Sequence, residues 1–404
     1  MKMANSINLL ISTPHYITFI KDQVEALSSH VEGIEVSITY NPLVEVSNIL
    51  PIGGKFTYFR KYTKKNLADF INVPNNVKIS FIPTIYVVPD GSNKAIGDKI
   101  FKNTVQWIED KKIKNDLIHA HFTWPCGYVG VKLANKYCVP LVVTAHGFDV
   151  YELPFRDQFW FNRVNYVLDN TSHIITVSQK MRNIIVRKLG ISDNKVSVIP
   201  NGFDSRLFCL RDKIRVRQNM DLPLNKKIIL NVANLIPVKG HSYLIEAMSK
   251  IVEERKDILC VIIGEDVLRK DLEKQIKKLN LENYVELVGA KPHNEIPLWM
   301  NAADFFVMSS LNEGNPTVMF EALGCGKPFI GTKVGGVPEI IINDKLGILV
   351  EPKDSVGLAK AIQRALETEW DEKYIREYAE QFMWGNISRQ IMDVYESVMK
   401  NEVN

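Results

Sequence analysis

The sequence predicts an α/β protein made of two Rossmann-like domains that face each other across a cleft, with a C-terminal helix that returns to the first domain. Short runs rich in Ile, Val and Leu alternate with longer amphipathic stretches along the whole chain. That alternation is typical of buried parallel strands joined by crossover helices. The 404 residues also exceed what a single hydrophobic core usually supports. A turn signal near the middle, followed by a charged segment, marks the division between the domains.

The expected strands are short apolar runs. In the first half they cover residues 7–11, 36–40, 77–82, 117–121, 141–145, 174–177 and 196–199. In the second half they cover residues 228–232, 259–263, 285–288, 305–308, 329–330 and 348–350. Most are separated by stretches with helical spacing, so two doubly wound parallel sheets are expected.

The domain boundary is expected at the turn Pro200-Asn201-Gly202, because residues 204–227 carry many charges and few apolar side chains, as a linker does. The first domain is therefore assigned to residues 1–203 and the second to residues 204–384. Residues 385–404 contain a last helix that is expected to pack back on the first domain. Its apolar residues at helical spacing are Ile387, Ile391, Val394, Tyr395 and Val398.

Composition places the chain among ordinary globular proteins, with 46% hydrophobic and 24% charged residues. The net charge of +4 is too small to indicate nucleic acid as a partner, but it suits an anionic small ligand or an anionic membrane surface. The five cysteines are scattered without a C-x-x-C pair, which favours a reducing compartment and argues against a zinc site. No apolar run approaches bilayer length, and the first residues resemble a strand more than a signal peptide. A cytoplasmic location is expected, either free or at the inner face of the membrane.

The segment from Glu313 to Glu321 is the strongest candidate site. It follows the expected strand 305–308, with Asn315 placed to cap a helix and Pro316 in its first turn. The free amides at such a helix start favour anionic or hydroxyl-rich ligands. Eight helical positions rise about 12 Å, which is too long for a hydrolase carboxylate pair working on one bond. The two glutamates are better placed to hold two ends of one elongated ligand than to act together as acid and base.

A second candidate is the loop that carries Lys239 and Gly240 between the expected strand 228–232 and the next helix. A lysine in such a loop can reach phosphate oxygens as a mobile point charge. Gly264 and Gly289 end or follow further strands and permit close approach of a ligand to the backbone. The pair Gly335-Gly336 forms another loop before a helix. Each glycine loop is weak evidence when taken alone.

These motifs resemble those of the family 4 retaining glycosyltransferases, which have the two-Rossmann GT-B architecture. The resemblance covers nearly the whole chain and is strongest over residues 174–350. The sequence resembles most the subset of the family that makes cell-surface polysaccharides, including teichuronic-acid-type enzymes. The most specific matches are Glu313-Gly314-Asn315-Pro316 with Glu321, Pro237-Val238-Lys239-Gly240, Ile199-Pro200-Asn201-Gly202-Phe203-Asp204, Thr144-Ala145-His146-Gly147 and Thr176-Val177-Ser178.

The resemblance implies that the second domain holds a UDP- or GDP-linked sugar and the first domain an acceptor, either a saccharide or a lipid-linked one. Lys239 would contact the diphosphate, and Glu321 would bind the ribose hydroxyls. Glu313 and the backbone that follows it would hold the donor sugar, and the base would lie near Gly289 and Pro292. The remaining donor-side positions are Asn234, Gly314, Asn315, Pro316 and Thr317.

His146 follows the expected strand 141–145 at the edge where ligands bind open α/β sheets. The resemblance implies that it lies near the donor sugar and the reacting centre. With Lys239 and Glu313 it forms the expected catalytic set. His15 and Ser178 are expected on the acceptor side. His119 and His121 share one face of a strand and invite a metal interpretation, although a core or cleft role is more common.

The implied reaction needs neither cofactor nor metal, since Lys239 and the amides of the helix start can stabilise the leaving diphosphate. No covalent nucleophile is assigned. Two positions depart from the family pattern: Asn234 stands where an arginine is common, and the loop over residues 12–16 contains no glycine. One positive contact to the diphosphate is therefore missing or supplied by another group.

Residues 55–65 interleave basic and aromatic side chains, which suits contact with an anionic membrane surface but equally suits a solvated helix with buried aromatics. Two other functions remain open. A nucleotide-sugar epimerase of the same architecture would share the donor chemistry. A non-catalytic nucleotide-binding relative is the other, because Asn234 stands where an arginine is common. A nicotinamide-dependent or sensor protein on Rossmann domains is disfavoured, since no G-x-G-x-x-G follows the first expected strand.

Overall fold

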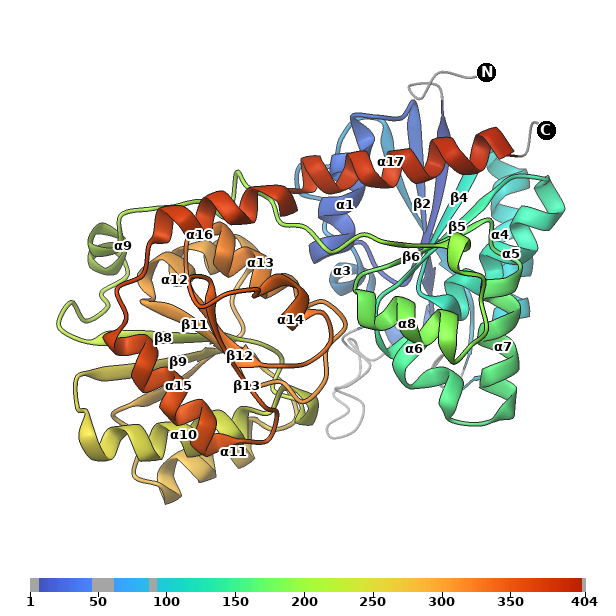
Figure 1. Cartoon of the computed structure of the whole chain (residues 1–404). Helices are drawn as coiled ribbons and strands as arrows, with labels where there is room; N and C mark the ends of the chain where they lie inside the picture. The colour runs from blue at the N-terminus through green and yellow to red at the C-terminus, as the bar shows by residue number, and fades with distance from the viewer. Residues whose placement is uncertain (1–6, 46–61, 87–92, 402–404) are drawn as a thin grey trace. The chain divides into compact units, whose positions relative to one another are not determined.

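The computed structural model describes residues 7–45, 62–86 and 93–401 (Figure 1). The chain divides into two compact units, the first formed by Met1–Pro200 with Trp384–Asn404 and the second by Asn201–Met383. The division falls inside the predicted turn, between Pro200 and Asn201. Phe203 belongs with the second unit because its N–H donates to the Phe382 carbonyl at 3.1 Å and its ring lies against Gly324.

The first unit contains a seven-stranded parallel sheet in the order β3-β2-β1-β4-β5-β6-β7. The strands are β1 (Asn8–Thr13), β2 (Gly33–Tyr40), β3 (Val77–Pro83), β4 (Leu117–His121), β5 (Leu141–Ala145), β6 (His173–Thr176) and β7 (Val196–Val198). Central strands such as β5 are buried along their whole length, which explains their continuous apolar sequences.

Helices cover both faces of this sheet. They are α1 (Thr18–Ser28), α3 (Lys64–Leu67), α4 (Ile96–Lys111), α5 (Tyr128–Tyr137), α6 (Phe148–Tyr151), α7 (Gln158–Asp169), α8 (Gln179–Arg187) and α17 (Trp384–Asn401). One core lies between the sheet and α4, α5, α7 and α8. The other core includes α1 and the apolar face of α17, so the C-terminal helix packs on the first unit as expected.

The second unit contains a six-stranded parallel sheet in the order β10-β9-β8-β11-β12-β13. The strands are β8 (Lys227–Val232), β9 (Ile258–Ile263), β10 (Val285–Gly289), β11 (Phe305–Met308), β12 (Phe329–Thr332) and β13 (Gly347–Val350). The helices are α9 (Lys213–Asn219), α10 (His241–Glu254), α11 (Arg269–Lys278), α12 (Ile296–Ala302), α13 (Thr317–Gly324), α14 (Val337–Ile340), α15 (Ser355–Glu367) and α16 (Glu372–Ala379). Two cores again lie on the two faces of the sheet.

Both sheets are doubly wound, which confirms the predicted fold class. In the first unit β1 lies between β2 and β4, and in the second β8 lies between β9 and β11. The chain leaves β1 toward β2 but leaves the neighbouring β4 toward β5, on the opposite side, so the loops at the carboxyl ends of β1 and β4 diverge. The loops after β8 and β11 diverge in the same way in the second unit. Such a topological switch point is where open α/β sheets bind their ligands.

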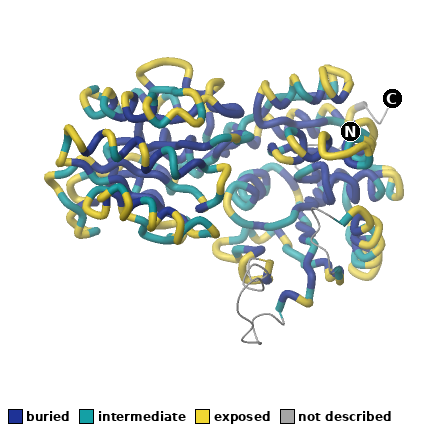
Figure 2. Tube along the Cα trace, turned by 90° about the horizontal axis from the view of Figure 1, so that it is seen from below, coloured by how far each residue is buried: buried dark blue, intermediate teal, exposed yellow. Residues whose placement is uncertain are grey.

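Burial follows the layers: buried residues run through the central strands, and exposed residues gather on the outer turns and helices (Figure 2). Among the described residues, no helix has the length and the apolar character that crossing a bilayer requires.

Candidate functional site

The switch point of the second unit joins the loops that follow β8 and β11. The Leu311 N–H donates to the Val238 carbonyl at 2.7 Å, and the Ser309 hydroxyl donates to the Lys239 carbonyl at 3.1 Å. Gly240 has a φ of +63°, and a Cβ there would lie 2.2 Å from the Ser309 carbonyl oxygen. Only glycine tolerates that approach and conformation, so the Lys239-Gly240 pair is needed to bring the two loops together.

Lys239 and Glu313 form an ion pair across this junction, with 2.7 Å between Nζ and Oε1. The Ser310 hydroxyl donates to the same carboxylate oxygen at 2.6 Å. The Lys239 side chain is 24% exposed and that of Glu313 10% exposed. Two residues predicted from separate motifs thus meet at the edge of the sheet where ligands bind.

The loop after β12 braces this arrangement. Gly335 has a φ of +54°, and a Cβ there would lie 2.1 Å from the Glu313 carbonyl oxygen. The neighbouring Gly336 N–H donates to the Gly314 carbonyl at 2.8 Å. The glycine pair noted in the sequence therefore supports the Glu313-Gly314 backbone.

The start of α13 differs from the prediction. Pro316 occupies the N-cap position without a side-chain cap, and Thr317 is the first helical residue. The prediction that Asn315 caps the helix is wrong, because its side-chain oxygen accepts the Asn201 N–H at 3.2 Å. The Asn201 side-chain amide donates in turn to the Asn315 carbonyl at 2.8 Å. Asn201 thereby fixes the loop that leads into α13.

Glu321 lies inside α13 and is 6% exposed. Its Oε1 lies 3.1 Å from Nε2 of His293, whose ring packs against Phe208 at 5.3 Å between centroids. His293 was not predicted from the sequence. Its position directly after Pro292, in the loop that follows β10, is the signal that would have indicated it.

The remaining donor-side positions vary in their surroundings. Asn234 and Pro292 are exposed, and Gly289 has a φ of +79° with only the tips of Arg269 and Glu265 near its missing Cβ. The prediction that Gly264 leaves room for a ligand is wrong. A Cβ at Gly264 would lie 1.9 Å from the Ala233 carbonyl oxygen, so the chain itself fills that space.

The switch point of the first unit holds a small pocket of about 80 Å³. Its walls come from β2, from the loops after β1, β2, β3 and β4, and from α3 and its approach. The residues are Pro14, His15, Thr39, Asn41, Tyr62, Leu67, Tyr86, Pro125 and Cys126. Burial lowers the pKa of His15 to about 4, so the ring is neutral near pH 7. Its Nδ1 is buried and has no hydrogen-bond partner among the described residues. One predicted acceptor-side residue thus lines a pocket at the expected place.

His146 follows β5 and lies close to this region. Phe19 contacts both histidine rings, at 5.1 Å from His146 and 6.2 Å from His15 between centroids. Nε2 of His146 lies 3.0 Å from Nδ1 of His121, and burial holds the pKa of His146 well below its usual 6.5. Ser178 is buried, and its hydroxyl accepts the Met181 N–H at 3.3 Å as the N-cap of α8. The structure thus gives Ser178 a capping role.

His119 and His121 do share a face of β4, with stacked rings 4.6 Å apart. His119 is engaged on both sides, by the Tyr395 hydroxyl at 2.6 Å and the Thr144 hydroxyl at 2.7 Å. Within the described ranges, no group of three or more His, Cys, Asp and Glu side chains is arranged to hold a metal ion.

Acidification is expected to destabilise the first unit. Burial lowers the pKa of His15 to about 4 and that of His119 to about 3, and holds those of His121 and His146 well below 6.5. The unfolded chain therefore binds more protons than the folded chain below pH 6.5. Each histidine's contribution to the free energy of unfolding is complete above pH 6.5. It falls by about 1.4 kcal/mol per pH unit as the pH drops toward the pKa of that histidine in the folded protein. Urea unfolding at pH 7.5 and 5.5 should show a lower midpoint at pH 5.5, and an equal midpoint would contradict this description.

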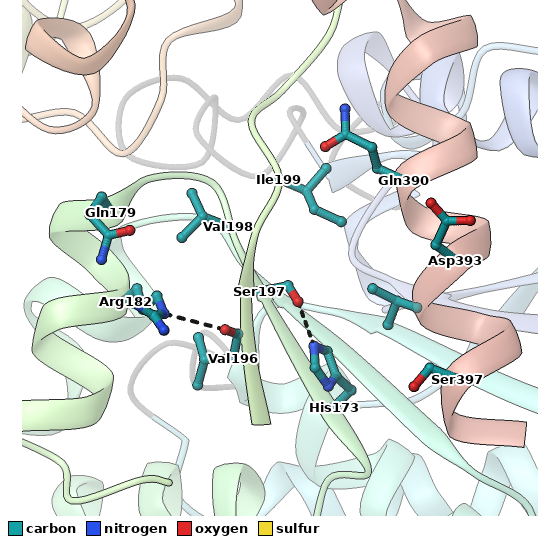
Figure 3. Close-up of a pocket in the computed structure, with 11 residues that line it drawn as sticks. His173, Gln179, Arg182, Val196, Ser197, Val198, Ile199, Gln390, Asp393 and Ser397 are labelled. Carbon is teal, nitrogen blue, oxygen red and sulfur yellow. Dashed lines mark hydrogen bonds between the residues drawn. The ribbon is translucent and has the colours of Figure 1, made fainter. Parts of the chain in front are cut away.

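A separate open groove of about 560 Å³ lies between the edge strand β7 and α17 (Figure 3). His173 of β6 and Ser197 of the neighbouring strand β7 bond at 2.8 Å in its lining, and the Arg182 guanidinium donates to the Val196 carbonyl at 3.4 Å. None of the predicted site residues lines this groove. The predicted site residues therefore lie elsewhere, and each unit is considered by itself.

Comparison with known proteins agrees with this arrangement. The family description "Glycosyltransferase Family 4" matches residues 61–207, and "Glycosyl transferases group 1" matches residues 212–382. An uncharacterised glycosyltransferase of Methanocaldococcus jannaschii is 31% identical over 315 residues, which cover 74% of this chain and 79% of that protein. TuaC of Bacillus subtilis, named as a teichuronic acid biosynthesis glycosyltransferase, is 28% identical over 85% of this chain and 86% of its own.

A solved structure of Anabaena HepE in complex with UDP is similar to this chain with a TM-score of 0.73 and 21% identity, covering 97% of this chain and 100% of that one. Two doubly wound units with polar loops at both switch points define a class of two-domain, Rossmann-like proteins. Within that class, the chain belongs to the family 4 glycosyltransferases, which have the GT-B architecture.

Proposed function

We propose that this protein is a retaining glycosyltransferase that moves a sugar from a nucleotide-diphosphate sugar to a saccharide or lipid-linked acceptor in the synthesis of a surface polysaccharide. The observation that carries the proposal is the Lys239–Glu313 pair at the switch point of the second unit, 2.7 Å apart. A nucleotide-diphosphate sugar carries its charge on the phosphates and its hydroxyls on the ribose and on the transferred sugar. A lysine paired with Glu313 at the loop that leads into α13, with Glu321 inside that helix, matches that distribution.

The donor is assigned to the second unit, residue by residue. Lys239 takes the diphosphate, Glu313 and the backbone at Gly314–Thr317 take the sugar, and Glu321 takes the ribose hydroxyls with His293 holding its carboxylate. HepE, whose fold this chain shares, binds UDP in its solved structure, which supports a nucleotide-linked donor.

The chemistry that these residues supply is electrostatic. Breaking the bond between sugar and phosphate places negative charge on the leaving diphosphate, and Lys239 with the amides at the start of α13 can stabilise it. The transfer is proposed to proceed without a metal and with retention of configuration. In the first unit, His146 near the reacting centre and His15 on the acceptor side are proposed to bond substrate hydroxyls with neutral rings.

The acceptor is proposed to belong to surface polysaccharide synthesis because TuaC, a relative along most of the chain, is named for teichuronic acid biosynthesis. A lipid-linked acceptor would require contact with the inner face of the cell membrane. Of the basic and aromatic segment 55–65, residues 55–61 lie outside the described part, while Tyr62, Lys64 and Lys65 are exposed.

Two exposed apolar side chains extend this surface, Phe70 at 57% and Ile71 at 68% exposure. We expect the protein to sediment with phosphatidylglycerol vesicles at low salt and to be released by high salt, since each lysine contributes about 1 kcal/mol near an anionic surface. Replacing Phe70 and Ile71 together by serine should reduce binding. Equal sedimentation with neutral phosphatidylcholine vesicles, or none with either, would count against the membrane contact.

A thermal-shift panel of nucleotide sugars tests the proposed function. A donor at one hundred times its Kd should stabilise the protein by about 2.7 kcal/mol, and a matching acceptor should then allow release of the free nucleotide. Glu321→Gln should reduce the shift because the ribose hydroxyls lose a carboxylate partner. No stabilisation by any UDP- or GDP-linked sugar would contradict the proposal. Turnover of donor without an acceptor would indicate an epimerase instead.

A further inference from the structure

The residues that line the open groove between β7 and α17 all belong to the first unit. The volume of about 560 Å³ lies within the range of ligand-binding clefts. The groove follows β7, with Gln179, Ile199 and Gln390 toward one end and His173 and Ser397 toward the other (Figure 3). None of the residues assigned to the donor or to the reacting end of the acceptor lines it. The proposed function therefore leaves this groove without a ligand.

One wall of the groove is a row of polar side chains on α17. Gln390, Asp393 and Ser397 are exposed and recur at i, i+3 and i+7, so they share one face of the helix. Within the described part of the chain, these three side chains have no hydrogen-bond or ion-pair partner. The row spans about 10 Å along the helix axis, which is longer than a single sugar ring. This wall therefore offers an amide, a carboxylate and a hydroxyl to an elongated ligand.

The opposite wall is the edge of the parallel sheet. In the described sheet β7 pairs only with β6, so alternate backbone groups of β7 point away from the sheet. The outward carbonyl of Val196 already accepts the Nε–H of Arg182 at 3.4 Å, and Arg182 also pairs with Asp193 at 2.6 Å. The strand is three residues long and one of its outward carbonyls is occupied. That edge is too short for an added peptide strand, which bonds over several residues.

The charges of the groove disfavour an anionic ligand. Of the lining residues, Arg182 alone carries a positive charge, and Asp193 already neutralises it. His173 bonds the Ser197 hydroxyl at 2.8 Å, and burial lowers the pKa of His173 below 6.5, so its ring is neutral near pH 7. A phosphate or a uronic acid would therefore be repelled by the Asp393 carboxylate without a free cation to offset it.

A neutral oligosaccharide fits this lining. Each sugar hydroxyl both donates and accepts hydrogen bonds, so a sugar site needs partners of both kinds. Arg182 supplies donors and Asp393 supplies acceptors, while the glutamine and serine side chains supply both. The apolar side chains of Val198, Ile199 and Val394 can contact the C–H faces of the sugar rings.

One end of the groove reaches the edge of the sheet where the acceptor is proposed to bind. Gln179, which lines the groove, begins α8 directly after Ser178, the predicted acceptor-side residue. His146 follows β5, the neighbour of β6, at the same carboxyl edge. A sugar chain whose reacting end lies at this edge can therefore continue into the groove.

We propose that the groove between β7 and α17 binds a neutral oligosaccharide and holds those sugar units of the acceptor that are remote from the reacting one. The acceptor role rests on the proposed function, whereas the binding of an oligosaccharide to the groove does not depend on it. The proposal narrows the acceptor to a chain of several sugars, because a monosaccharide at the reacting centre would leave the groove empty.

Calorimetric titration of the whole protein with neutral sugars of increasing length, without nucleotide, measures this binding. The probes are glucose, maltose and maltotetraose, and the corresponding series of N-acetylglucosamine. In at least one series the tetrasaccharide should bind about 10-fold more tightly than the monosaccharide, because it reaches along the row on α17. Equal affinities within both series, or no binding of either tetrasaccharide, would overturn the proposal. Tighter binding of tetragalacturonate would contradict the assignment of a neutral ligand.

A double variant on α17 places the binding in the groove. Gln390→Ala with Asp393→Ala removes an amide and a carboxylate, and alanine favours the helix. The Kd of the tetrasaccharide should rise by about 10-fold or more, since a hydrogen bond to a charged group is among those lost. Arg389→Ala with Glu396→Ala is the matched control, because both residues lie on the same helix outside the lining, and it should leave the Kd unchanged. Equal effects of the two double variants would mean that the sugar binds elsewhere.

Transfer reactions separate this proposal from the proposed function. The KM for a tetrasaccharide acceptor should rise in the Gln390→Ala, Asp393→Ala protein by about the same factor as the Kd. If the unmodified protein binds tetrasaccharides in the groove but binds no nucleotide sugar, the proposed function fails while the groove assignment stands. If it transfers sugar while the groove variant has the KM of the unmodified protein, the groove assignment alone fails.

Discussion

Replacing Lys239 by alanine is expected to weaken binding of UDP by roughly 10- to 100-fold. The ammonium is the cation placed at the switch point of the second unit, and a hydrogen bond to a charged group contributes about 1.5–3 kcal/mol. The substitution also leaves Glu313 without its partner at 2.7 Å, so an unpaired carboxylate would face the phosphates. Isothermal titration with UDP and GDP measures the effect.

A double-mutant cycle separates these two contributions. If repulsion from Glu313 adds to the loss of the cation, the variant carrying both Lys239→Ala and Glu313→Ala should bind UDP more tightly than Lys239→Ala alone. Lys274→Ala is the matched control, because Lys274 is 80% exposed on α11 and its ion pair with Asp271, at 3.6 Å, contributes little. Equal UDP affinities for Lys239→Ala and the unmodified protein would show that the donor does not bind at this location.

Gly335→Ala is expected to destabilise the second unit and to abolish donor binding together. The position has a φ of +54°, which costs an alanine about 1–2 kcal/mol. Its Cβ would also meet the Glu313 carbonyl oxygen at 2.1 Å and the Gly314 carbonyl oxygen at 2.6 Å. The backbone that carries Glu313 must therefore shift, and the Lys239–Glu313 bond shifts with it. We expect a total loss of about 2–4 kcal/mol, in the range of a strained or overpacked site.

Differential scanning calorimetry measures this loss, since about 1 kcal/mol moves the Tm of a unit of this size by roughly 2–4 °C. Gly385→Ala is the control, because, beyond its own stretch of α17, no described residue has a heavy atom within 4 Å of the position that its Cβ would take. That change should leave the Tm unchanged or raise it slightly. A Gly335→Ala protein with the normal Tm and normal UDP affinity would show that the loop after β12 does not brace the site.

Sequence patterns predicted the fold well because it depends on local regularities. Residues 117–121, 141–145 and 305–308 were expected as strands and form β4, β5 and β11 with the same bounds. Apolar residues at helical spacing likewise placed the C-terminal helix on the first unit. Strands buried on both faces require continuous apolar sequence, and such runs can be recognised without any knowledge of tertiary contacts.

The sequence identified the main residues of the candidate site but not the residues that hold them in place. The Lys239 and Glu313 motifs were identified separately, and their contact follows from the order of β8 and β11 in the sheet. Asn315 was wrongly assigned a capping role because its partner, Asn201, lies 114 positions away. His293 was missed for a similar reason: its bond to Glu321 joins the loop after β10 to α13. Contacts of this kind depend on tertiary structure, which a local pattern does not encode.

A crystal structure of the complex with UDP, or with the nucleotide that stabilises the protein most, tests the central claim most directly. We predict a diphosphate oxygen within hydrogen-bond distance of Lys239 Nζ and ribose hydroxyls on Glu321, with the ammonium drawn from Glu313 toward the phosphates. A nucleotide bound elsewhere, for example in the groove between β7 and α17, with the Lys239–Glu313 pair unchanged at 2.7 Å, would contradict it.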